Sequence, residues 1–514
     1  MVRGKCALFV ATFFGGLIGF LAAWGLPPVF SSSHRPQPIA DQSLVATSQL
    51  QQKVIAKQTA PIGPAKKPNI LFILMDNLGY GEVGCYGGGL IRGAATTRID
   101  KLARQGTKLL NFNVEPQCTP SRSAFLTGRM ALRSGTQAVP LAGGRYGLTQ
   151  WEITLAELLQ ALNYWTGLFG KWHLGNIEGR FPTDQGFDEW YGIPDTTDES
   201  QWSSQPGYDP KVGNEPFIYE GKKGEKVRQV APFDLNARPE IDMDITDRTI
   251  DFIKRAVAAK KPFYAFASYT LVHFPTVPSK AFKGKTGNGD WADCLAQMDH
   301  NVGRLIDTVD NLGIADDTIV IFVSDNGANH TQLHRRGHAG PWSGTMFAPM
   351  EGSNRVPCII RWPNKVPADR ESNEIVHQVD TFTTLAKFAG ADIPKDRPID
   401  GLDQTDFLLG KSEKSAREGF LVYFNDKLCA ARWRNFTVHY VWQVKATDPV
   451  ETLSVPRVFN LLTNPGEFPD ENLFNTHAWV IRATARMVAD YNASLKEHPP
   501  IPPGTPDPYT PGKK

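Results

Sequence analysis

Two acid–amide pairs follow apolar runs of the sequence. Asp76 and Asn77 come directly after NILFILM, and Asp325 and Asn326 come directly after TIVIFVS. Ligands of open α/β sheets bind beyond the carboxyl ends of the strands, so two such strands would bring these four side chains to one edge. Their carboxylate and amide oxygens suit Ca²⁺ or Mg²⁺. Asp and Asn also commonly begin turns, and this structural explanation stays open for either pair alone.

A dense motif begins at Cys118 and ends at Arg129, where the chain reads CTPSRSAFLTGR. It resembles the signature C-x-P-S-R followed by T-G-R of the sulfatases, a family similar in fold to alkaline phosphatase. The alternative is that Cys118 is an unmodified buried or free thiol. Pro120 and Arg122 stand at the required offsets and favour the sulfatase signature.

The resemblance extends from about residue 68 to residue 410. A second family pattern is matched by NYWT at 163–166 and GKWH at 170–173, and His273 also falls on a family position. Asn163 stands where the family has glycine. Asparagine is the residue that next best tolerates a positive φ, so the backbone turn expected there is still feasible.

The resemblance implies that Cys118 is oxidised to Cα-formylglycine by a formylglycine-generating enzyme. The aldehyde hydrates to a diol, of which one hydroxyl attacks sulfur and the other then expels sulfate by re-forming the aldehyde. A serine would be left as a sulfate ester that needs a second displacement, so the diol divides the reaction into two easier steps. The implied activity is arylsulfatase-like hydrolysis of sulfate esters, on a sulfated small molecule or carbohydrate.

The resemblance also implies roles for the other site residues. One calcium ion would be held by Asp76, Asn77, Asp325, Asn326 and the modified Cys118. Arg122 would hold the hydrated aldehyde, and Lys171 would neutralise charge on the sulfate. His173 would take the proton of the second hydroxyl, and His273 would protonate the leaving alcohol or phenol.

Two positions depart from the family pattern. The family mostly has aspartate where this chain has Asn77, so the calcium site has less negative charge and we expect looser binding. The family usually has a lysine where this chain has Met346. The basic segment 334–338 (HRRGH) follows the Asp325-Asn326 loop, and we hypothesise that one of its side chains supplies the missing charge. An exposed loop without a catalytic role is the alternative.

The remaining pattern indicates the elements that position these residues. Apolar runs at 69–75, 263–269, 318–323 and 358–362 are typical of buried strands. A capping box at 154–157 opens a helix to about Leu162, and a second helix over about 295–309 ends before Gly313. This order predicts an α/β fold with a largely parallel central sheet sandwiched by helices. The resemblance to sulfatases implies that this fold is similar to that of alkaline phosphatase.

We expect five segments along the chain. Residues 1–30 form a membrane anchor or signal peptide, 31–67 a flexible linker, 68–410 the catalytic domain and 411–498 a smaller C-terminal subdomain with an antiparallel sheet of strands at 420–424, 428–433 and 437–443. The proline-rich tail at 499–514 is expected to be disordered. The long segment 194–239 is expected at the rim of the pocket, where Trp190, Tyr191 and Trp202 could stack on a ring, although such aromatics are more often packed internally.

The N-terminus predicts export. Arg3 and Lys5 precede an uncharged stretch from Ala7 to Leu26, about the ~20 residues that cross a bilayer. This is longer than the apolar region of an ordinary signal peptide, so a retained anchor is favoured over cleavage. Positive charge on the N-terminal side places the rest of the chain outside the cytoplasm, in a periplasmic or other extracytoplasmic compartment.

Composition narrows the classes of function. The net charge of +2 and the 21% of charged residues give no reason to expect nucleic-acid binding. The six cysteines show no spacing typical of a zinc site or a disulfide framework. Two alternatives to a sulfatase remain: a phosphonate or phosphodiester hydrolase on the same scaffold, and a membrane-anchored binding protein that has lost activity.

Overall fold

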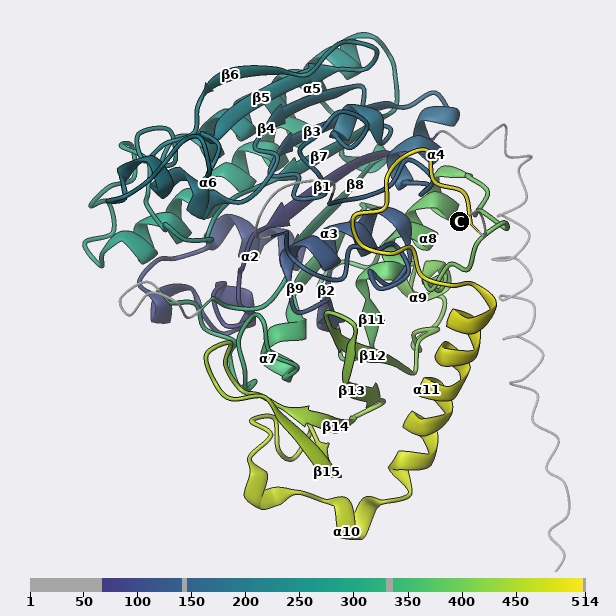
Figure 1. Cartoon of the computed structure of the whole chain (residues 1–514). Helices are drawn as coiled ribbons and strands as arrows, with labels where there is room; N and C mark the ends of the chain where they lie inside the picture. Colours follow the sequence, from purple (N-terminus) through teal and green to yellow (C-terminus); the bar gives the residue numbers. More distant parts are fainter. Residues whose placement is uncertain (1–66, 141–145, 330–335, 512–514) are drawn as a thin grey trace, which may run out of the picture. The chain divides into compact units, whose positions relative to one another are not determined.

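The computed structural model describes residues 67–140, 146–329 and 336–511. Its main element is an eleven-stranded sheet with the strand order β10-β2-β9-β8-β1-β7-β3-β4-β5-β6 and β11 paired to β2. The strands are β1 (Asn69–Met75), β2 (Thr107–Asn113), β3 (Trp165–Gly170), β4 (Glu189–Gly192), β5 (Phe217–Lys222), β6 (Arg228–Pro232), β7 (Phe263–Ser268), β8 (Thr318–Ser324), β9 (Arg355–Arg361), β10 (Arg370–Ser372) and β11 (Val376–His377). The five neighbours from β8 to β4 run parallel, which confirms the predicted largely parallel sheet (Figure 1).

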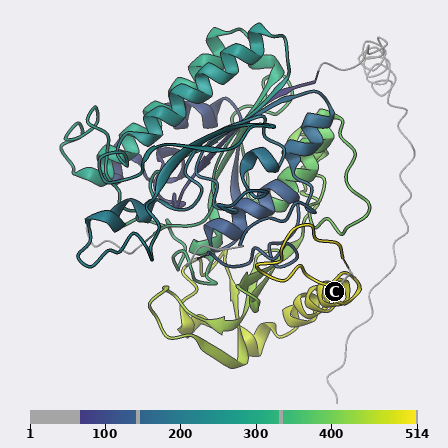
Figure 2. The same ribbon diagram turned by 45° about the horizontal axis from the view of Figure 1, so that its top comes forward.

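Helices cover both faces of this sheet (Figure 2). They are α2 (Thr97–Arg104), α3 (Cys118–Thr127), α4 (Leu155–Ala161), α5 (Ile241–Ala258), α6 (Asp290–Asn311) and α8 (Gln378–Ala389), with short helices α7 (Glu351–Asn354) and α9 (Thr405–Leu408). The predicted capping box opens α4, with Thr154 and Glu157 bonded to each other's backbone N–H. Gly313, just beyond α6, has a φ of 67°, the left-handed conformation expected of a glycine at a helix end.

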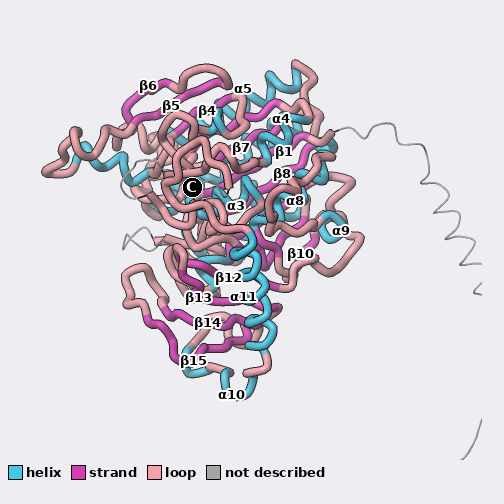
Figure 3. The backbone as a smooth tube through the Cα atoms, turned by 45° about the vertical axis from the view of Figure 1, so that its right-hand side comes forward, coloured by secondary structure: helices cyan, strands magenta, loops and turns pink. Residues whose placement is uncertain are grey.

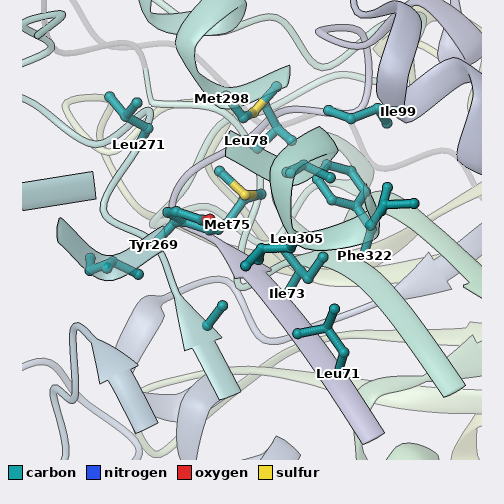
Figure 4. Close-up of a cluster of buried hydrophobic side chains, with 14 of the residues drawn as sticks. Leu71, Ile73, Met75, Leu78, Ile99, Tyr269, Leu271, Met298, Leu305 and Phe322 are labelled. Carbon is teal, nitrogen blue, oxygen red and sulfur yellow. The ribbon is translucent and has the colours of Figure 1, made fainter. Parts of the chain in front are cut away.

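The alternating side chains of β1 build two cores. Leu71, Ile73 and Met75 face α2, α5 and α6, where they pack with residues such as Met298 and Leu305 (Figure 4). Ile70, Phe72 and Leu74 face the other way, toward α3, α4 and α8. A strand buried on both faces reads as a continuous apolar run, which is why β1 was predictable.

Strand β9 is antiparallel to both of its neighbours, β8 and β2. In the described residues of the connection from β8, the one helix is the four-residue α7, and an antiparallel neighbour needs no long crossover helix. The apolar run at 358–362 predicted a strand here but carried no information about its direction.

The C-terminal part has its own four-stranded sheet (Figure 3), and all of its strand pairs are antiparallel, as predicted. Its strands are β12 (Gly419–Phe424), β13 (Lys427–Trp433), β14 (Phe436–Trp442) and β15 (Glu451–Asn460), followed by α10 (Phe474–His477) and α11 (Val480–Glu497). Strand β15 was missed because it is a mostly exposed edge strand that contains Pro456. The domain boundary at residues 410 and 411 stays a prediction.

A buried ionic cluster links this sheet to the segment before β9. Glu351 accepts a hydrogen bond from Arg432 of β13 at 3.0 Å, and its own N–H donates to Glu467 at 3.0 Å. Glu467 also contacts Nε2 of His439 on β14 at 2.6 Å. All four residues are buried, so this cluster of charged side chains connects the C-terminal sheet to the segment before β9.

The tail differs from the expectation of disorder over the described residues 499–511. Ile501 is only 2% exposed, and its N–H donates to the carbonyl of Arg133. Further along, Asp507 forms an ion pair with Arg180 at 3.0 Å, and Tyr509 packs edge-on against Trp151. The buried Ile501 side chain and the ion pair between Arg180 and the partly exposed Asp507 fix this proline-rich segment, although it lacks apolar periodicity.

Other expectations concern the ends of the chain and the cysteines. The predicted anchor at 1–30 and almost all of the linker at 31–67 lie outside the described residues. Within the described ranges, no helix is long and apolar enough to cross a membrane. No disulfide joins the five cysteines in the described ranges.

Candidate active site

The predicted site residues gather at the carboxyl ends of the parallel strands. Each follows a strand end closely, apart from Cys118, which is the first residue of α3. By strand, they are Asp76 and Asn77 after β1, Asp325 and Asn326 after β8, Lys171 and His173 after β3, and His273 after β7. All of these side chains are at most 3% exposed. The topology therefore brings together residues that are up to 250 positions apart in the chain, as between Asp76 and Asn326.

Two positive and two negative side chains form a compact buried network. Lys171 Nζ lies 2.7 Å from Asp76 Oδ2. Arg122 Nη2 lies 2.8 Å from Asp325 Oδ2 and 3.4 Å from Asp76 Oδ2. Nη1 of Arg122 donates to the hydroxyl of Ser268 at 2.7 Å and to the carbonyl of Lys171. This arrangement pairs every charge, which buried charges require.

The network sets the protonation of its members. Burial alone would raise the pKa of Asp76, but the nearby charges of Lys171, His273 and Arg122 hold it below its usual value. Burial and the negative charge of Asp76 raise the pKa of Asp325 to about 6. Burial lowers and Asp76 raises the pKa of Lys171, and the net shift is upward, so the lysine stays charged.

Cys118 lies within the field of this network. Burial raises the pKa of its thiol to about 11, while Lys171 lowers it and the carboxylates of Asp76 and Asp325 raise it. An unmodified Cys118 is therefore a neutral thiol at neutral pH. Its position at the start of the ten-residue α3 also exposes it to the positive end of that helix's dipole.

The two acid–amide pairs meet, and they leave oxygen atoms without partners. Asn326 Nδ2 donates to Asn77 Oδ1 at 2.7 Å, and the backbone N–H of Asn77 donates to Asp325 Oδ1 at 3.1 Å. Asp76 Oδ1 and Asn326 Oδ1 are buried without a hydrogen-bond partner. Hard oxygen atoms that lack donors fit a cation such as Ca²⁺.

This site contains two carboxylates and two amides. Among the described residues there is no group of three or more His, Cys, Asp and Glu side chains that could hold a metal ion. The proposed metal site has four side-chain ligands only if the two asparagines are included. All of these ligands are oxygen atoms, which suit calcium, whereas zinc favours nitrogen and sulfur.

The two histidines differ in their surroundings. Nδ1 of His273 lies 2.7 Å from the carbonyl oxygen of Phe274, an acceptor, so the proton is on Nδ1. Nε2 is then turned toward Thr196 Oγ1, at 3.3 Å. Neither ring nitrogen of His173 has a partner, and burial with the charges of Lys171 and Arg122 places its pKa well below the usual value.

Two threonines of the site were missed by sequence reasoning. Thr196 Oγ1 lies 3.4 Å from Lys171 Nζ as well as near His273, and Thr197 Oγ1 lies 2.7 Å from His273 Nδ1. They follow β4, whose four residues are too short to read as a strand from the sequence. A signal was present, because these threonines open the segment 194–239 that was placed at the pocket rim.

Comparison with known proteins identifies the family. The sulfatase family model matches residues 68–391, more than half of the chain. The chain belongs to the sulfatase family. A second model, described as N-sulphoglucosamine sulphohydrolase, C-terminal, matches residues 346–471.

Individual sulfatases match over most of their length. Steryl-sulfatase of Mus musculus is 33% identical over 480 residues, which cover 80% of this chain and 75% of the relative. N-acetylgalactosamine-6-sulfatase of Canis lupus familiaris is 30% identical over 467 residues, covering 84% and 87%. The crystal structure of PsFucS1 sulfatase from Pseudoalteromonas sp. has a TM-score of 0.80 at 30% identity and covers 90% of this chain and 96% of that one. The chain is a sulfuric-ester hydrolase.

The position of the missing sulfatase lysine is occupied by a buried side chain. Met346 is 4% exposed, and its N–H donates to the carbonyl of Ala328 at 3.0 Å. In the basic segment, Arg336 is exposed, and Nδ1 of His338 accepts a hydrogen bond from the N–H of Gly340. His334 and Arg335 lie outside the described residues. The hypothesis that this segment replaces the lysine stays a prediction.

The aromatic residues considered for sulfatase substrate stacking are mostly internal. Trp190 is 2% exposed and stacks on Phe181 and Tyr219, and Tyr191 belongs to the core under α5. Trp202 is half-buried in the 3-10 turn Thr197–Ser204. Part of the expected rim is also sheet, because β5 and β6 extend the edge next to β4. The packing interpretation holds for Trp190 and Tyr191.

Proposed function

We propose that this sulfatase hydrolyses sulfate esters through a formylglycine made from Cys118, with one Ca²⁺ held by Asp76, Asn77, Asp325 and Asn326. The observation that carries the proposal is the buried, charge-paired network around Cys118, with its two partnerless oxygens. Proteins seldom bury so many charges at one point without a use for them.

The modification of Cys118 would require a formylglycine-generating enzyme during maturation. Formylglycine supplies a hydrated aldehyde, whose two hydroxyls serve in turn as nucleophile and as the source of electrons that release sulfate. Arg122, about one helical turn after Cys118 in α3, orients this group by charge-assisted hydrogen bonds. Lys171, which stays protonated, offers the sulfate a positive charge.

The calcium site would be completed by the modified residue 118 beside the four acid and amide side chains. Bound Ca²⁺ supplies a Lewis acid that favours the ionised nucleophile and attracts a sulfate oxygen. Arg122 and Lys171 hold Asp76 and Asp325 in place through Oδ2 of each, which leaves the other oxygens for the ion. Asn77 contributes no charge, and we expect a lower affinity than a third aspartate would give.

The histidines move the protons. His173 is neutral and has both ring nitrogens free, so it can accept the proton of the second hydroxyl. His273 presents Nε2 toward the site, while the Phe274 carbonyl holds the proton on Nδ1. A sulfate anion bound nearby favours the doubly protonated imidazole, which can then donate from Nε2 to the leaving oxygen.

The substrate and the compartment follow from the relatives and the N-terminus. The matched relatives are named for steryl and N-acetylgalactosamine sulfates, so we propose a sulfated small molecule or carbohydrate as substrate. The uncharged stretch from Ala7 to Leu26 supports export and membrane anchoring, with the site in an extracytoplasmic compartment.

Peptide mass spectrometry of the purified exported protein tests the modification. The expected peptide contains an aldehyde at residue 118, and its fraction should rise in parallel with the turnover of 4-nitrophenyl sulfate. Cys118→Ala is the control and should be inactive with the same fold. A thiol at residue 118 in fully active protein would reject the mechanism.

Calorimetric titration with Ca²⁺ tests the metal site independently of activity. The metal-free chain should bind one ion, with a rise in thermal stability. Asn77→Asp should bind more tightly, because a carboxylate replaces an amide, and Asp325→Asn should bind more weakly. Unchanged or weaker binding by Asn77→Asp contradicts the proposed role of residue 77.

A further inference from the structure

The residue after Met346 has a backbone conformation that normally belongs to glycine. Phe347 has a φ of 66°, in the left-handed region. For a residue with a side chain this conformation costs roughly 1–2 kcal/mol, and aromatic residues rarely adopt it. A strained residue that survives beside an active site is a candidate for a functional role.

Two contacts place Phe347 next to the chain that leads into Cys118. Its N–H donates to the carbonyl of Pro116 at 2.9 Å, two residues before Cys118. Its ring meets the ring of Phe424 edge-on, with the centroids 6.4 Å apart at 85°. Both phenylalanines are only half-buried.

The turn that carries Phe424 is fastened to the same place. Asn425, in the turn between β12 and β13, accepts a hydrogen bond from Gln117 Nε2 at 3.4 Å. Gln117 is 2% exposed, and its Oε1 accepts from the N–H of Val139 at 3.2 Å. Gln117, immediately before Cys118, thus connects the β12–β13 turn to the start of α3. This contact keeps Phe424, at the end of β12, next to Phe347.

We propose that Phe347, backed by Phe424, determines substrate specificity by packing against the flat face of a ring in the leaving group. The inference rests on the proposed function of the site. The neighbouring Met346 carries no charge, so the leaving group meets an apolar aromatic wall at this point instead of a cation. Aryl rings and pyranose rings share a flat, largely apolar face that packs well on an aromatic side chain.

Kinetics with three sulfate esters tests this role. The substrates are 4-nitrophenyl sulfate, a pyranose 6-sulfate and trifluoroethyl sulfate, which has no ring. The variants are Phe347→Leu, which keeps apolar bulk and the strained backbone, and Phe347→Gly, which loses the ring and relieves the strain. Phe424→Leu tests the supporting ring. Phe468→Leu, an exposed phenylalanine of the C-terminal part, is the matched control.

We expect Phe347→Leu and Phe347→Gly to lower kcat/KM about three- to tenfold on a ring-bearing ester, mainly through KM, and to leave trifluoroethyl sulfate unchanged. Phe424→Leu should shift the same substrates in the same direction by less. Loss on the aryl ester alone identifies an aryl leaving group, and loss on the sugar ester alone identifies a sugar. Equal loss on all three esters, or none, overturns the inference. A wild-type chain inactive on every ester would instead reject the proposed function.

Discussion

At the scale of single residues, the site contains charged groups fixed in ion pairs and, beside them, two histidines that we propose as proton carriers. Lys171 and Arg122 are fixed by carboxylates, whereas neither ring nitrogen of His173 has a hydrogen-bond partner. His273 is held at Nδ1 by the Phe274 carbonyl, and its Nε2 has the hydroxyl of Thr196 at 3.3 Å. A proton carrier needs a nitrogen that faces the reacting atoms, and this pattern leaves one available on each ring.

His273 is expected to matter most for poor leaving groups. A phenolate such as 4-nitrophenolate leaves without much help, but an alkoxide must be protonated as it departs. We expect His273→Ala to lower kcat/KM by about 10²–10⁴-fold on a sugar sulfate and much less on 4-nitrophenyl sulfate. A plot of log kcat/KM against leaving-group pKa should steepen in the variant. Parallel lines for the two proteins would show that His273 is not the acid.

Glu115 gives a prediction about stability and pH. Burial, reinforced by Asp400, raises the pKa of this carboxyl from 4.5 to about 8. The folded chain therefore keeps a proton that the unfolded chain releases near pH 4.5, and the stability due to that proton is lost as the pH rises through about 8.

Glu115→Gln should remove this dependence. Glutamine imitates the protonated carboxyl, so the variant and the wild type should melt together near about pH 5, and the variant should melt higher near about pH 8.5. Scanning calorimetry at several pH values measures the difference. A difference that is constant with pH would mean that Glu115 does not titrate in the folded protein.

At the scale of elements, the strand ends were the predictable part of the site. Apolar runs such as β1 and β8 are buried on both faces and so appear as continuous hydrophobic segments, and the polar residues after them fell where expected. Short or exposed strands lack that signal, which is why β4, with Thr196 and Thr197 behind it, and the edge strand β15 were missed. The roles of the two threonines depend on the packing of β4 against β3, which no local pattern encodes.

The turn from α4 to β3 tests a sequence-based expectation at this scale. Asn163 has a φ of 66°, as predicted for the position where the family has glycine. Asn163→Gly should leave the free energy of unfolding within about 0.5 kcal/mol of the wild type, whereas Asn163→Val should lower it by about 1–2 kcal/mol because a branched side chain resists this conformation. Urea unfolding measures both. Equal stability of the two variants would show that the turn adjusts its backbone freely.

At the scale of the whole described chain, the C-terminal tail and the C-terminal sheet both pack against the part that carries the site. Sequence reasoning placed the C-terminal sheet correctly but treated the tail as disordered, because composition does not reveal a single buried anchor. Ile501 is that anchor, beside the carbonyl of Arg133.

Removing the anchor should be costly. We expect Ile501→Ala to lower the free energy of unfolding by about 2–4 kcal/mol, since a buried side chain is replaced by a cavity. Leu462→Ala, of similar size but 62% exposed, should change it by no more than about 0.5 kcal/mol. Similar losses for the two variants in urea titrations would contradict a structural role for the tail.

The ionic cluster around Glu351 has a consequence for chimaeras between sulfatases. Exchange of everything after residue 410 would remove Arg432 and Glu467 while leaving Glu351 behind. Glu351 would keep its ion pair with Arg355 at 2.5 Å but lose the one with Arg432, and removal of one partner from a buried ion pair typically destabilises a protein, by up to about 3–5 kcal/mol. The C-terminal sheet is therefore interchangeable only between chains that have the same four ionisable residues at these positions, or when the segment with Glu351 is exchanged together with the sheet.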